Sequence, residues 1–589
     1  MPTFDTATQQ NIDTWLNGDY DEATKNEIRQ MVKESPEKAI DAFYTKLDFG
    51  TGGLRGVVGV GTNRMNRYTV MAATQGLANY LAKQSKEGGH SVFIGYDSRV
   101  HSREFAEVSA RVLAGNGIKV YIFNELRPTP LVSFGCRARN CSAAIVVTAS
   151  HNPPEYNGYK VYWNDGGQVV PPHDTGIIAE VNKINDLNQI KCTEVTNPLI
   201  EWVDGEVDEE YVTAIHPLQN YAADNKNRGK TLKVVYTSLH GTGITVVPKV
   251  LEDWGFSNYI LVPEQCKPDG TFPTVKSPNP EERSALKLGI DVLNKVFGDI
   301  LLATDPDADR MAVAVRHHGN VEVLTGNQIA CVCLEHVLRA LVTQKRLPEK
   351  AAFVKTIVTT ELFRIITEAY GRPCVDVLTG FKYIAQVIHE WEQSPDGLKF
   401  IYGAEESYGY LLGDIVRDKD AVISSALVCE VALQAKLQGK TLVDLLHHLY
   451  QKYGVYREKL SSIYYGEGKA NKEKMDQAMA NLRSSPPKTI HSTPVISVED
   501  YLTSTHTDMR TGKTRALELP KSNVYAFHLN DGSKVVVRPS GTEPKIKLYG
   551  GVSRPSLSTS HDQVIAQCDT LVTELLESVV KLLSVSPST

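Results

Sequence analysis

The feature that most constrains the fold is an alternation of short apolar runs with stretches of helical periodicity, which continues through most of the chain. Apolar runs of this length are typical of strands in parallel sheets that helices cover on both faces. At 589 residues the chain is too long for one hydrophobic core, so several α/β domains are expected. The runs are SVFIGYDSR (91–99), KVYIFNE (119–125), AAIVVTASHN (143–152), LKVVYTSLHGTG (232–243), DILLATDPDADR (299–310), FVKTIVTT (353–360) and FIYGAEESYGY (400–410).

The C-terminal part has a different pattern. NVYAFHL, SKVVVRPSG and KIKLYGG resemble antiparallel strands, and a final helix is predicted from apolar residues at helical spacing between Val564 and Leu582. The fold class predicted is α/β: three consecutive α/β domains with mixed, mostly parallel sheets plus a C-terminal α+β domain. Because polar residues follow the carboxyl ends of the strands, the domains are expected to surround one central cleft. The predicted ranges are 1–205, which includes a helical N-terminal extension, 206–322, 323–460 and 461–589.

Charge and cysteine content exclude some classes of function. Lys and Arg total 63 against 69 Asp and Glu, and this net charge of −6 argues against a nucleic-acid-binding protein. The nine scattered cysteines are odd in number, which favours core thiols in a reducing compartment. The polar N-terminus does not resemble a signal peptide, and no apolar run approaches the roughly 18 residues that span a membrane. We therefore expect a soluble, cytoplasmic protein without nucleic-acid or membrane partners.

The stretch VVTASHNPPEYNGYK (146–160) places a serine, a histidine and a lysine on what the sequence predicts to be one stiffened loop. Two prolines end the apolar strand near Ser150, because they cannot donate to a ladder. A strand-end serine often only caps a turn. With His151, Asn152 and Lys160 nearby, Ser150 is also a candidate nucleophile, although the GxSxG elbow of the α/β-hydrolases is missing. These residues alone do not decide whether Ser150 caps a turn or acts as a nucleophile.

DPDADR (305–310) follows a buried strand and carries three carboxylates at alternate positions. Asp305, Asp307 and Asp309 can turn oxygens toward one hard cation, and Mg²⁺ is the expected ion. A calcium EF-hand is excluded because Arg310 and Arg316 occupy the positions that require Gly and Glu. The alternative is a phosphatase of the DxD type in which Asp305 is the nucleophile.

VVRPSGTEPKIKLY (536–549) suits phosphate binding. A guanidinium, two hydroxyls and the backbone N–H groups of a turn can form a cradle for a phosphate, and the alternative is a β-turn capped by Ser and Thr. Lys545 and Lys547 add positive charge but could also belong to an exposed strand face. The residues of the cradle are Arg538, Ser540, Gly541 and Thr542.

Three further segments carry weaker signals. GAEES places Glu405 and Ser407 at a strand end, where such groups bind sugar hydroxyls or form a solvated turn. TGFKYI offers a turn at Thr379–Gly380 with an aromatic ring and a lysine, and RDKD offers Lys419 as a proton donor or phosphate partner. FGTGGLRG displays Arg55 on a glycine-rich turn without the Walker or Rossmann spacing, so neither ATP nor NAD is implied.

Taken in order, GGLRG, TASHNP with NGYK, DPDADR, GAEES and RPSGTEP resemble the α-D-phosphohexomutase superfamily. The motifs span residues 49–544, and the chain looks closest to the long phosphoglucomutase/phosphopentomutase branch. Tyr408-Gly409-Tyr410 stands where bacterial phosphomannomutases often have Gly-His, and RDKD matches the lysine segment of phosphoglucomutases.

The resemblance implies a role for each motif. Ser150 would carry a phosphoryl group and, with the three aspartates, hold one Mg²⁺. Sugar hydroxyls would contact the Thr379–Gly380 turn, Glu405 and Ser407, and the RPSGT residues would hold the phosphate that is not transferred. Arg55, Lys160 and Arg310 would surround the transferring phosphate, with His151 beside the serine. Lys419 is the remaining catalytic candidate, as an acid/base.

The activity implied is interconversion of sugar 1-phosphate and sugar 6-phosphate, with glucose 1-phosphate the first choice and a sugar 1,6-bisphosphate as activator. A lysine whose pKa is lowered by cationic neighbours would relay the proton, and either Lys160 or Lys419 could do so. Phosphopentomutase, phosphomannomutase and bisphosphate synthase activities remain alternatives, as does the phosphatase. A small phosphosugar is the expected partner, and a monomer or weak dimer the expected state.

Overall fold

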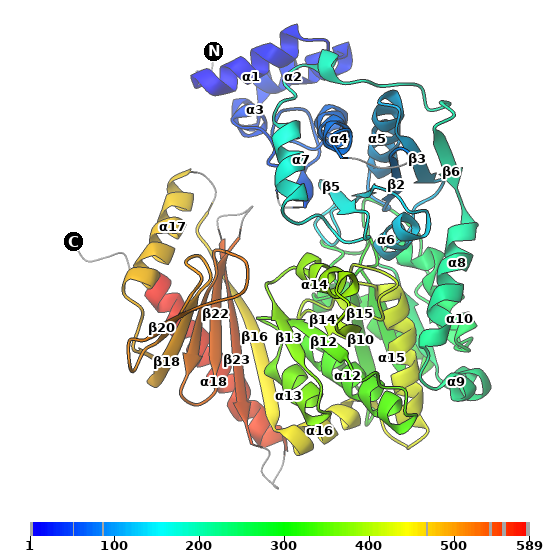
Figure 1. The fold of residues 1–589 in the computed structure, drawn as a ribbon, viewed down its shortest axis with the longest axis vertical. Coiled ribbons are helices and arrows are strands. Elements are labelled where there is room, and N and C mark those ends of the chain that lie inside the picture. Colours follow the sequence, from blue (N-terminus) through cyan, green and yellow to red (C-terminus); the bar gives the residue numbers. More distant parts are fainter. Residues whose placement is uncertain are drawn as a thin grey trace.

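The computed structural model describes residues 4–50, 52–84, 88–466, 469–540, 545–555 and 561–584. Four β-sheets follow one another along the chain. Figure 1 shows helices around the first three sheets and a separate, sheet-rich unit at the C-terminal end. The predicted class, three consecutive α/β units followed by an α+β unit, is confirmed.

The chain opens with a small helical extension. Asp5 and Asp21 cap its first two helices by accepting the backbone N–H groups of Thr8 and Thr24, each at 2.9 Å. Trp15 packs edge-on against Phe43 and Tyr68, and this cluster fixes the extension to the first unit. The helices are α1 (Thr6–Asn17), α2 (Glu22–Glu34) and α3 (Pro36–Phe43).

The first sheet has the order β1-β5-β4-β2-β3-β6. Its core strands β4, β2, β3 and β6 are parallel, whereas β5 returns antiparallel to β4 and pairs with β1. Lys160 pairs with Val146 and therefore lies on a strand, not on the predicted loop, because the chain re-enters the sheet at Tyr156. The elements are β1 (Gly53–Val57), α4 (Arg67–Leu81), β2 (Ser91–Tyr96), α5 (Ser102–Gly115), β3 (Lys119–Phe123), α6 (Thr129–Ala138), β4 (Ala143–Val147), β5 (Tyr156–Trp163), α7 (His173–Val181), η1 (Leu187–Gln189) and β6 (Ile200–Val203).

The second sheet has the order β11-β10-β9-β7-β8. β8, β7 and β9 are parallel, and β9, β10 and β11 form an antiparallel meander. The DPDADR segment is the tight turn between β9 and β10, closed by the pairing of Thr304 with Met311. The elements are α8 (Gly205–Ile215), η2 (His216–Leu218), α9 (Ala222–Arg228), η3 (Gly229–Thr231), β7 (Val234–Thr237), η4 (Thr242–Thr245), α10 (Val247–Asp253), β8 (Tyr259–Leu261), α11 (Arg283–Val296), β9 (Ile300–Thr304), β10 (Met311–His317) and β11 (Asn320–Leu324).

The third sheet has the order β13-β12-β14-β15, with only β15 antiparallel to its neighbour. The GAEESYG segment forms the turn between β14 and β15, so it meets the same cleft edge as the other strand ends. The elements are α12 (Gly326–Thr343), β12 (Ala351–Thr356), α13 (Glu361–Ala369), β13 (Cys374–Val377), α14 (Phe381–Gln393), β14 (Lys399–Ala404), β15 (Tyr410–Leu412), α15 (Ala421–Lys436) and α16 (Leu442–Tyr453).

The fourth sheet is antiparallel, as predicted, with the order β16-β23-β22-β21-β18-β19-β20 and β17 paired to β18. The final helix packs on β16 and β23. Its apolar stripe ends on buried Leu583, whereas Leu582, which the spacing placed in the stripe, is exposed. The elements are β16 (Val455–Tyr464), α17 (Lys469–Ser484), β17 (Thr489–Ile490), β18 (Thr493–Asp500), β19 (Thr505–Asp508), β20 (Thr514–Ala516), β21 (Tyr525–Leu529), β22 (Lys534–Pro539), β23 (Lys545–Arg554) and α18 (His561–Ser584).

Two of the predicted domain limits fall inside strands. The limit after residue 322 lies within β11 of the second sheet, and the limit after residue 460 lies within β16, which pairs with β23 along its whole length. Strand pairing in three dimensions, which local composition does not report, sets these borders. One of the hydrophobic core clusters includes residues from the first unit to the last, so the units are packed together.

The cysteines are all unpaired, and most are buried, as expected for core thiols; Cys192 is exposed and is an exception. Across the helices that the structure describes, none combines the length and apolar content that crossing a bilayer would need.

Candidate active site

Ser150 lies in the loop that leaves β4, in a buried and conformationally unusual position. Its φ of 51° is in the left-handed region, which non-glycine residues adopt mainly where surrounding contacts demand it. Its backbone N–H donates to Thr148 Oγ1 at 2.8 Å, and that hydroxyl donates to Asp97 Oδ2 at 2.6 Å. These two hydrogen bonds fix the loop to the buried carboxylate of Asp97.

Arg99 holds the same loop from the other side. Its guanidinium donates to the carbonyls of Ser150 at 2.6 Å, Pro153 at 2.8 Å and Tyr156 at 2.9 Å, and also to that of Asn152. It forms a fully buried ion pair with Asp97 at 3.3 Å. Sequence reasoning missed this pair, although both residues stand in the strand-end segment YDSR, where polar groups after a parallel strand were the available signal.

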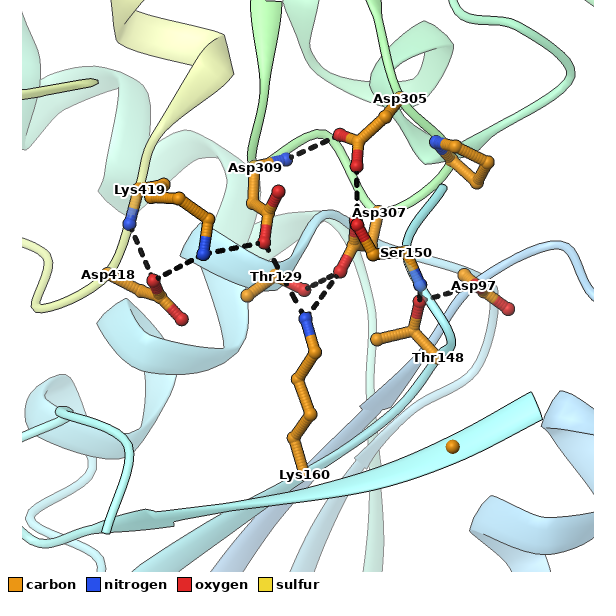
Figure 2. A network of polar contacts seen from close by, with 12 residues as sticks. Asp97, Thr129, Thr148, Ser150, Lys160, Asp305, Asp307, Asp309, Asp418 and Lys419 are labelled. Atoms are coloured by element: carbon orange, nitrogen blue, oxygen red, sulfur yellow. Dashed lines mark hydrogen bonds and ion pairs between the residues drawn. The ribbon is translucent and has the colours of Figure 1, made fainter. Parts of the chain in front are cut away.

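The three aspartates of the β9–β10 turn are buried against Ser150. The serine Oγ donates to Asp305 Oδ2 at 2.7 Å, and one carboxylate oxygen from each aspartate lies within 4.8 Å of the others (Figure 2). Burial raises the pKa of Asp305, and the adjacent charges of Asp307 and Asp309 raise it further. Within the described part of the chain, Asp307 Oδ1 and Asp309 Oδ1 are buried without a hydrogen-bond partner. Such concentrated, unsatisfied oxygen ligands fit a hard divalent cation.

Two lysines from different units reach this carboxylate cluster. Lys160 Nζ on β5 is 2.8 Å from Asp307 and 3.5 Å from Asp309, and Lys419 Nζ is 3.0 Å from Asp309 (Figure 2). Burial alone would lower the pKa of each lysine, but the facing aspartates hold both pKa values above the usual lysine value. The direction is opposite to the expected lowering of a lysine pKa, because carboxylates and not cations are the nearest charges in this arrangement.

His151 and two arginines surround the serine hydroxyl. His151 Nδ1 is 3.1 Å from Ser150 Oγ, and burial, reinforced by Arg310 and Arg55, holds the pKa of His151 well below its usual value. Arg55 on β1 donates to Asn152 Oδ1 at 3.1 Å, which brings it to the serine loop. Two of the predicted residues, His151 and Arg55, thus contact the serine loop, and the charge of Arg310 acts on the same imidazole.

Arg310 is anchored by a residue that the sequence did not reveal. Its guanidinium donates to Glu281 Oε1 at 2.5 Å, and Glu281 comes from the loop before α11. The carboxylate, the adjacent Asp309 and Glu405 all raise the pKa of Arg310 against the opposing effect of burial. The PNPEE segment carries no pattern that distinguishes this glutamate from a solvated loop residue.

The two predicted sugar-binding segments meet. Glu405 Oε1 accepts the backbone N–H of Gly380 at 3.0 Å, and Thr379 Oγ1 is buried without a hydrogen-bond partner among the described residues. Ser407 is half-buried in the turn that follows. A backbone bridge between Arg310 and Gly409 joins this turn to the aspartate turn. Polar groups of the third unit therefore lie close to the turn that carries the carboxylate cluster.

The C-terminal unit adds cations to this cleft. Arg538 on β22 pairs in register with Lys547 on β23, and Ser540 donates its backbone N–H to Lys545 O at 2.8 Å. Burial lowers the pKa of Lys547, as do Lys545 and Arg538, and Lys547 in turn contributes to the lowered pKa of His151. Lys547 thus faces the site instead of lying on an exposed strand face. Gly541 and Thr542 lie outside the described residues.

Comparison with known proteins agrees with this geometry. Family models for phosphoglucomutase/phosphomannomutase match as alpha/beta/alpha domain I at residues 46–188, domain II at residues 209–319 and domain III at residues 325–453. The third matched range begins after β11 ends and stops before β16 begins, in keeping with the strand pairing.

Curated relatives and solved structures give the same result. The phosphoglucomutase of Staphylococcus aureus (strain MRSA252) is 37% identical over 544 residues, which covers 92% of this chain and 95% of the relative. The phosphoglucomutase of Staphylococcus epidermidis (strain ATCC 12228) is 38% identical over 538 residues, with coverages of 91% and 95%. The structure of Paramecium pp63/parafusin, a phosphoglucomutase, aligns with a TM-score of 0.66 at 17% identity, covering 92% of this chain and 96% of that one. A phosphoglucomutase/phosphomannomutase family protein from Burkholderia thailandensis aligns with a TM-score of 0.63 at 18% identity, with coverages of 91% and 97%.

The four-unit fold with a buried serine facing three aspartates defines the protein as an α-D-phosphohexomutase, a class of phosphotransferase isomerases. The chain belongs to the phosphoglucomutase branch of the phosphoglucomutase/phosphomannomutase family. The predicted superfamily and the predicted class of enzyme, a phosphosugar mutase, are confirmed.

We expect Arg99→Lys to destabilise the protein by about 2–4 kcal/mol, because an ammonium cannot span several carbonyls while it also pairs with the buried Asp97. The measurement is urea unfolding followed by tryptophan fluorescence. Arg103→Lys is the matched control: Arg103 is exposed on α5, and its change should stay within about 0.5 kcal/mol. Equal unfolding midpoints for Arg99→Lys and wild type would contradict the role given to this guanidinium.

Proposed function

We propose that the enzyme interconverts a sugar 1-phosphate and the corresponding sugar 6-phosphate, with Ser150 as the carrier of the phosphoryl group. The observation that supports this most directly is the contact of 2.7 Å between Ser150 Oγ and Asp305. The serine lies against three carboxylates that could bind a metal ion, and lysines and arginines are close by. These are the surroundings that a phosphoserine needs.

We assign Asp305, Asp307, Asp309 and the phosphorylated Ser150 as ligands of one Mg²⁺. The two aspartate oxygens without hydrogen-bond partners support this assignment, and Mg²⁺ takes few protein ligands and completes its shell with phosphate and water. When bound, the ion neutralises charge on the phosphoryl oxygens. It would also offset the mutual repulsion of the three buried carboxylates.

The first chemical step transfers the phosphoryl group from Ser150 to the sugar. The bond from Ser150 Oγ to phosphorus breaks while a bond forms from phosphorus to the free hydroxyl oxygen of the sugar monophosphate. One proton moves from the sugar hydroxyl to Ser150 Oγ, and the product is a bound sugar bisphosphate. After the bisphosphate reorients, its other phosphate returns to Ser150 by the reverse chemistry.

The cationic residues have separable roles in this scheme. Arg55 and Arg310 flank the transferring group, and the neutral His151 lies beside the serine oxygen. Lys160 and Lys419 both lie against the aspartates, so both suit charge neutralisation and proton donation to a leaving oxygen. The proton relay is assigned to this pair of lysines.

The substrate is held at two further places. Sugar hydroxyls are assigned to Glu405, Ser407 and the Thr379–Gly380 turn, where the unpartnered Thr379 Oγ1 can pair with a ligand hydroxyl. The phosphate that is not transferred is assigned to the RPSGT segment. The residues of this segment are Arg538, Ser540, Gly541 and Thr542.

Glucose 1-phosphate is the preferred substrate in this proposal, followed by pentose and then mannose phosphates, and a sugar 1,6-bisphosphate primes the serine. We further propose that the enzyme works in the cytoplasm as a monomer or weak dimer on a small phosphosugar, without a nucleic-acid or membrane partner. The named relatives support the substrate class, because those of the two staphylococci are phosphoglucomutases.

Ser150→Ala should lower mutase turnover by on the order of 10³-fold or more and abolish labelling of the protein by radioactive bisphosphate, because the phosphate has no acceptor oxygen. Coupled assay and mass spectrometry of the peptide provide the measurements. Ser98→Ala is the control, since the Ser98 hydroxyl is buried without a hydrogen-bond partner among the described residues and its loss should change neither readout. Retained turnover in Ser150→Ala would instead favour a phosphatase with Asp305 as nucleophile.

Removal of divalent ions with EDTA should stop turnover, and added Mg²⁺ should restore it. In thermal melts, Mg²⁺ at about 100 times its Kd should stabilise the wild type by about 2.7 kcal/mol. Asp307→Asn should lose most of this stabilisation, whereas Asp291→Asn on the exposed face of α11 should keep it. A Mg²⁺ response that survives in Asp307→Asn would place the ion elsewhere.

Comparison of kcat/KM for glucose, ribose and mannose 1-phosphates, each with trace glucose 1,6-bisphosphate, tests the substrate. We expect glucose 1-phosphate to give the highest value. The same reactions with a bisphosphorylated glycolytic donor test for bisphosphate synthase activity. A pentose preference would revise the substrate but leave the role of Ser150 intact.

A further inference from the structure

A second group of metal-ligating side chains lies at the far end of β10. His317 ends this strand, and His318 follows in the turn to β11 with a left-handed φ of 46°. Asp444 and His447 lie one turn apart on α16, so they share a helix face. We call His317, His318, Asp444 and His447 the histidine cluster. It is well separated from the aspartate turn, which is at the opposite end of β10, roughly 20 Å away at about 3.3 Å per residue.

Three members of the histidine cluster, His317, His318 and Asp444, have ligand atoms close enough together for one ion. One ring nitrogen of His317, one of His318 and one carboxylate oxygen of Asp444 all lie within 4.8 Å of one another. The His317 ring centroid is 4.0 Å from that of His318 and 6.2 Å from that of His447. A tetrahedral Zn²⁺ with bonds near 2.0–2.1 Å needs ligand atoms about 3.4 Å apart, so small side-chain rotations suffice. His318 is exposed and can make such a rotation.

Hydrogen bonds prepare two members of the cluster as ligands. The Thr441 hydroxyl donates to Asp444 Oδ2 at 3.0 Å and lies 2.9 Å from His317 Nδ1, which is itself 3.8 Å from Asp444 Oδ2. When Nδ1 donates in the contact with Thr441, Nε2 of the neutral His317 ring carries the lone pair that a metal ion needs. This is the arrangement in which a ligating histidine uses its other nitrogen to fix its tautomer.

The surroundings of Asp444 also favour its ionised form, which is the form that binds a cation. Partial burial opposes ionisation, but the backbone and hydroxyl donors of Thr441 hold the pKa of Asp444 below its usual value. His447 lies between His317 and His561, and burial, together with these two rings, lowers the pKa of His447. Packing several imidazoles together is unfavourable when they are protonated, whereas a metal ion makes the same packing favourable.

We propose that the histidine cluster is a binding site for a borderline transition-metal ion of the Zn²⁺ class, held by His317, His318 and Asp444, with His447 as a further ligand. Imidazole and carboxylate donors suit Zn²⁺ better than Mg²⁺, which prefers oxygen ligands alone. This site is independent of the phosphosugar chemistry and of the aspartate cluster.

The bound ion would join separate parts of the fold. His317 and His318 belong to the hairpin of the second sheet, and Asp444 belongs to α16 of the third unit. Helix α16 packs against α18 and continues through Gly454 directly into β16, the first strand of the C-terminal unit (Figure 1). The ion would thus stabilise the joint at which the C-terminal unit is attached.

Zn²⁺ binding to the intact enzyme, measured by equilibrium dialysis in saturating Mg²⁺, tests the proposal. The wild type should bind one more equivalent of Zn²⁺ at micromolar concentration than His318→Gln, and Zn²⁺ should raise the Tm of the wild type only. Asp444→Asn should show the same loss. His448→Gln is the matched control, because His448 is the exposed neighbour of His447 on α16 and should keep the wild-type stoichiometry.

Two results would overturn the proposal. One is equal Zn²⁺ stoichiometry and affinity in the wild type and in a correctly folded His318→Gln variant, whose mutase activity in Mg²⁺ reports the fold. The other is a wild type that binds no Zn²⁺ at micromolar concentration. The expected outcome is loss of one equivalent with unchanged Mg²⁺-dependent turnover, since the histidine cluster is remote from the active site.

Discussion

The buried negative charge of Asp305, Asp307 and Asp309 is the constraint on which the architecture of the site depends. Three carboxylates removed from water repel one another and are tolerated only with compensating cations and hydrogen bonds. The first unit supplies Lys160 and the third supplies Lys419, while backbone N–H groups of the turn itself satisfy Asp305. These lysines and N–H groups stabilise the turn, and Asp305 Oδ2 still accepts the hydrogen bond of the serine hydroxyl.

The position of that hydroxyl is set by backbone contacts as much as by side chains. Asp97 and Arg99 together hold the loop after β4 through one threonine hydroxyl and four carbonyls. A serine in left-handed conformation persists only when its surroundings determine it to this degree. A rigid acceptor oxygen is what phosphoryl transfer between bound groups requires, because the chemistry relies on positioning and charge neutralisation.

Contacts between units keep the lysines in place. Tyr162 on β5 donates to Asp418 at 2.7 Å, and the backbone N–H of Arg417 donates to Ser133 at 3.0 Å, so two hydrogen bonds connect the RDKD segment to the first unit. Tyr211 on α8 donates to Asp420 at 2.6 Å and extends this connection to the next unit. The location of Lys419 is therefore a property of the packed assembly, and not of the third unit alone.

The sequence by itself determined the succession of α/β units, the antiparallel C-terminal sheet, the family, and the motifs that meet in the cleft, because periodicity and strand-end polar residues are local features of the chain. Only the tertiary structure decided which distant groups touch. It paired Lys160 with Val146 on a strand, placed Glu281 on Arg310, and raised the pKa values of the two lysines by packing them on aspartates from another unit. It also brought His317 and His318 of the second unit together with Asp444 and His447 of the third at the histidine cluster. Charges interact through space, so their effect depends on distances that spacing along the chain does not contain.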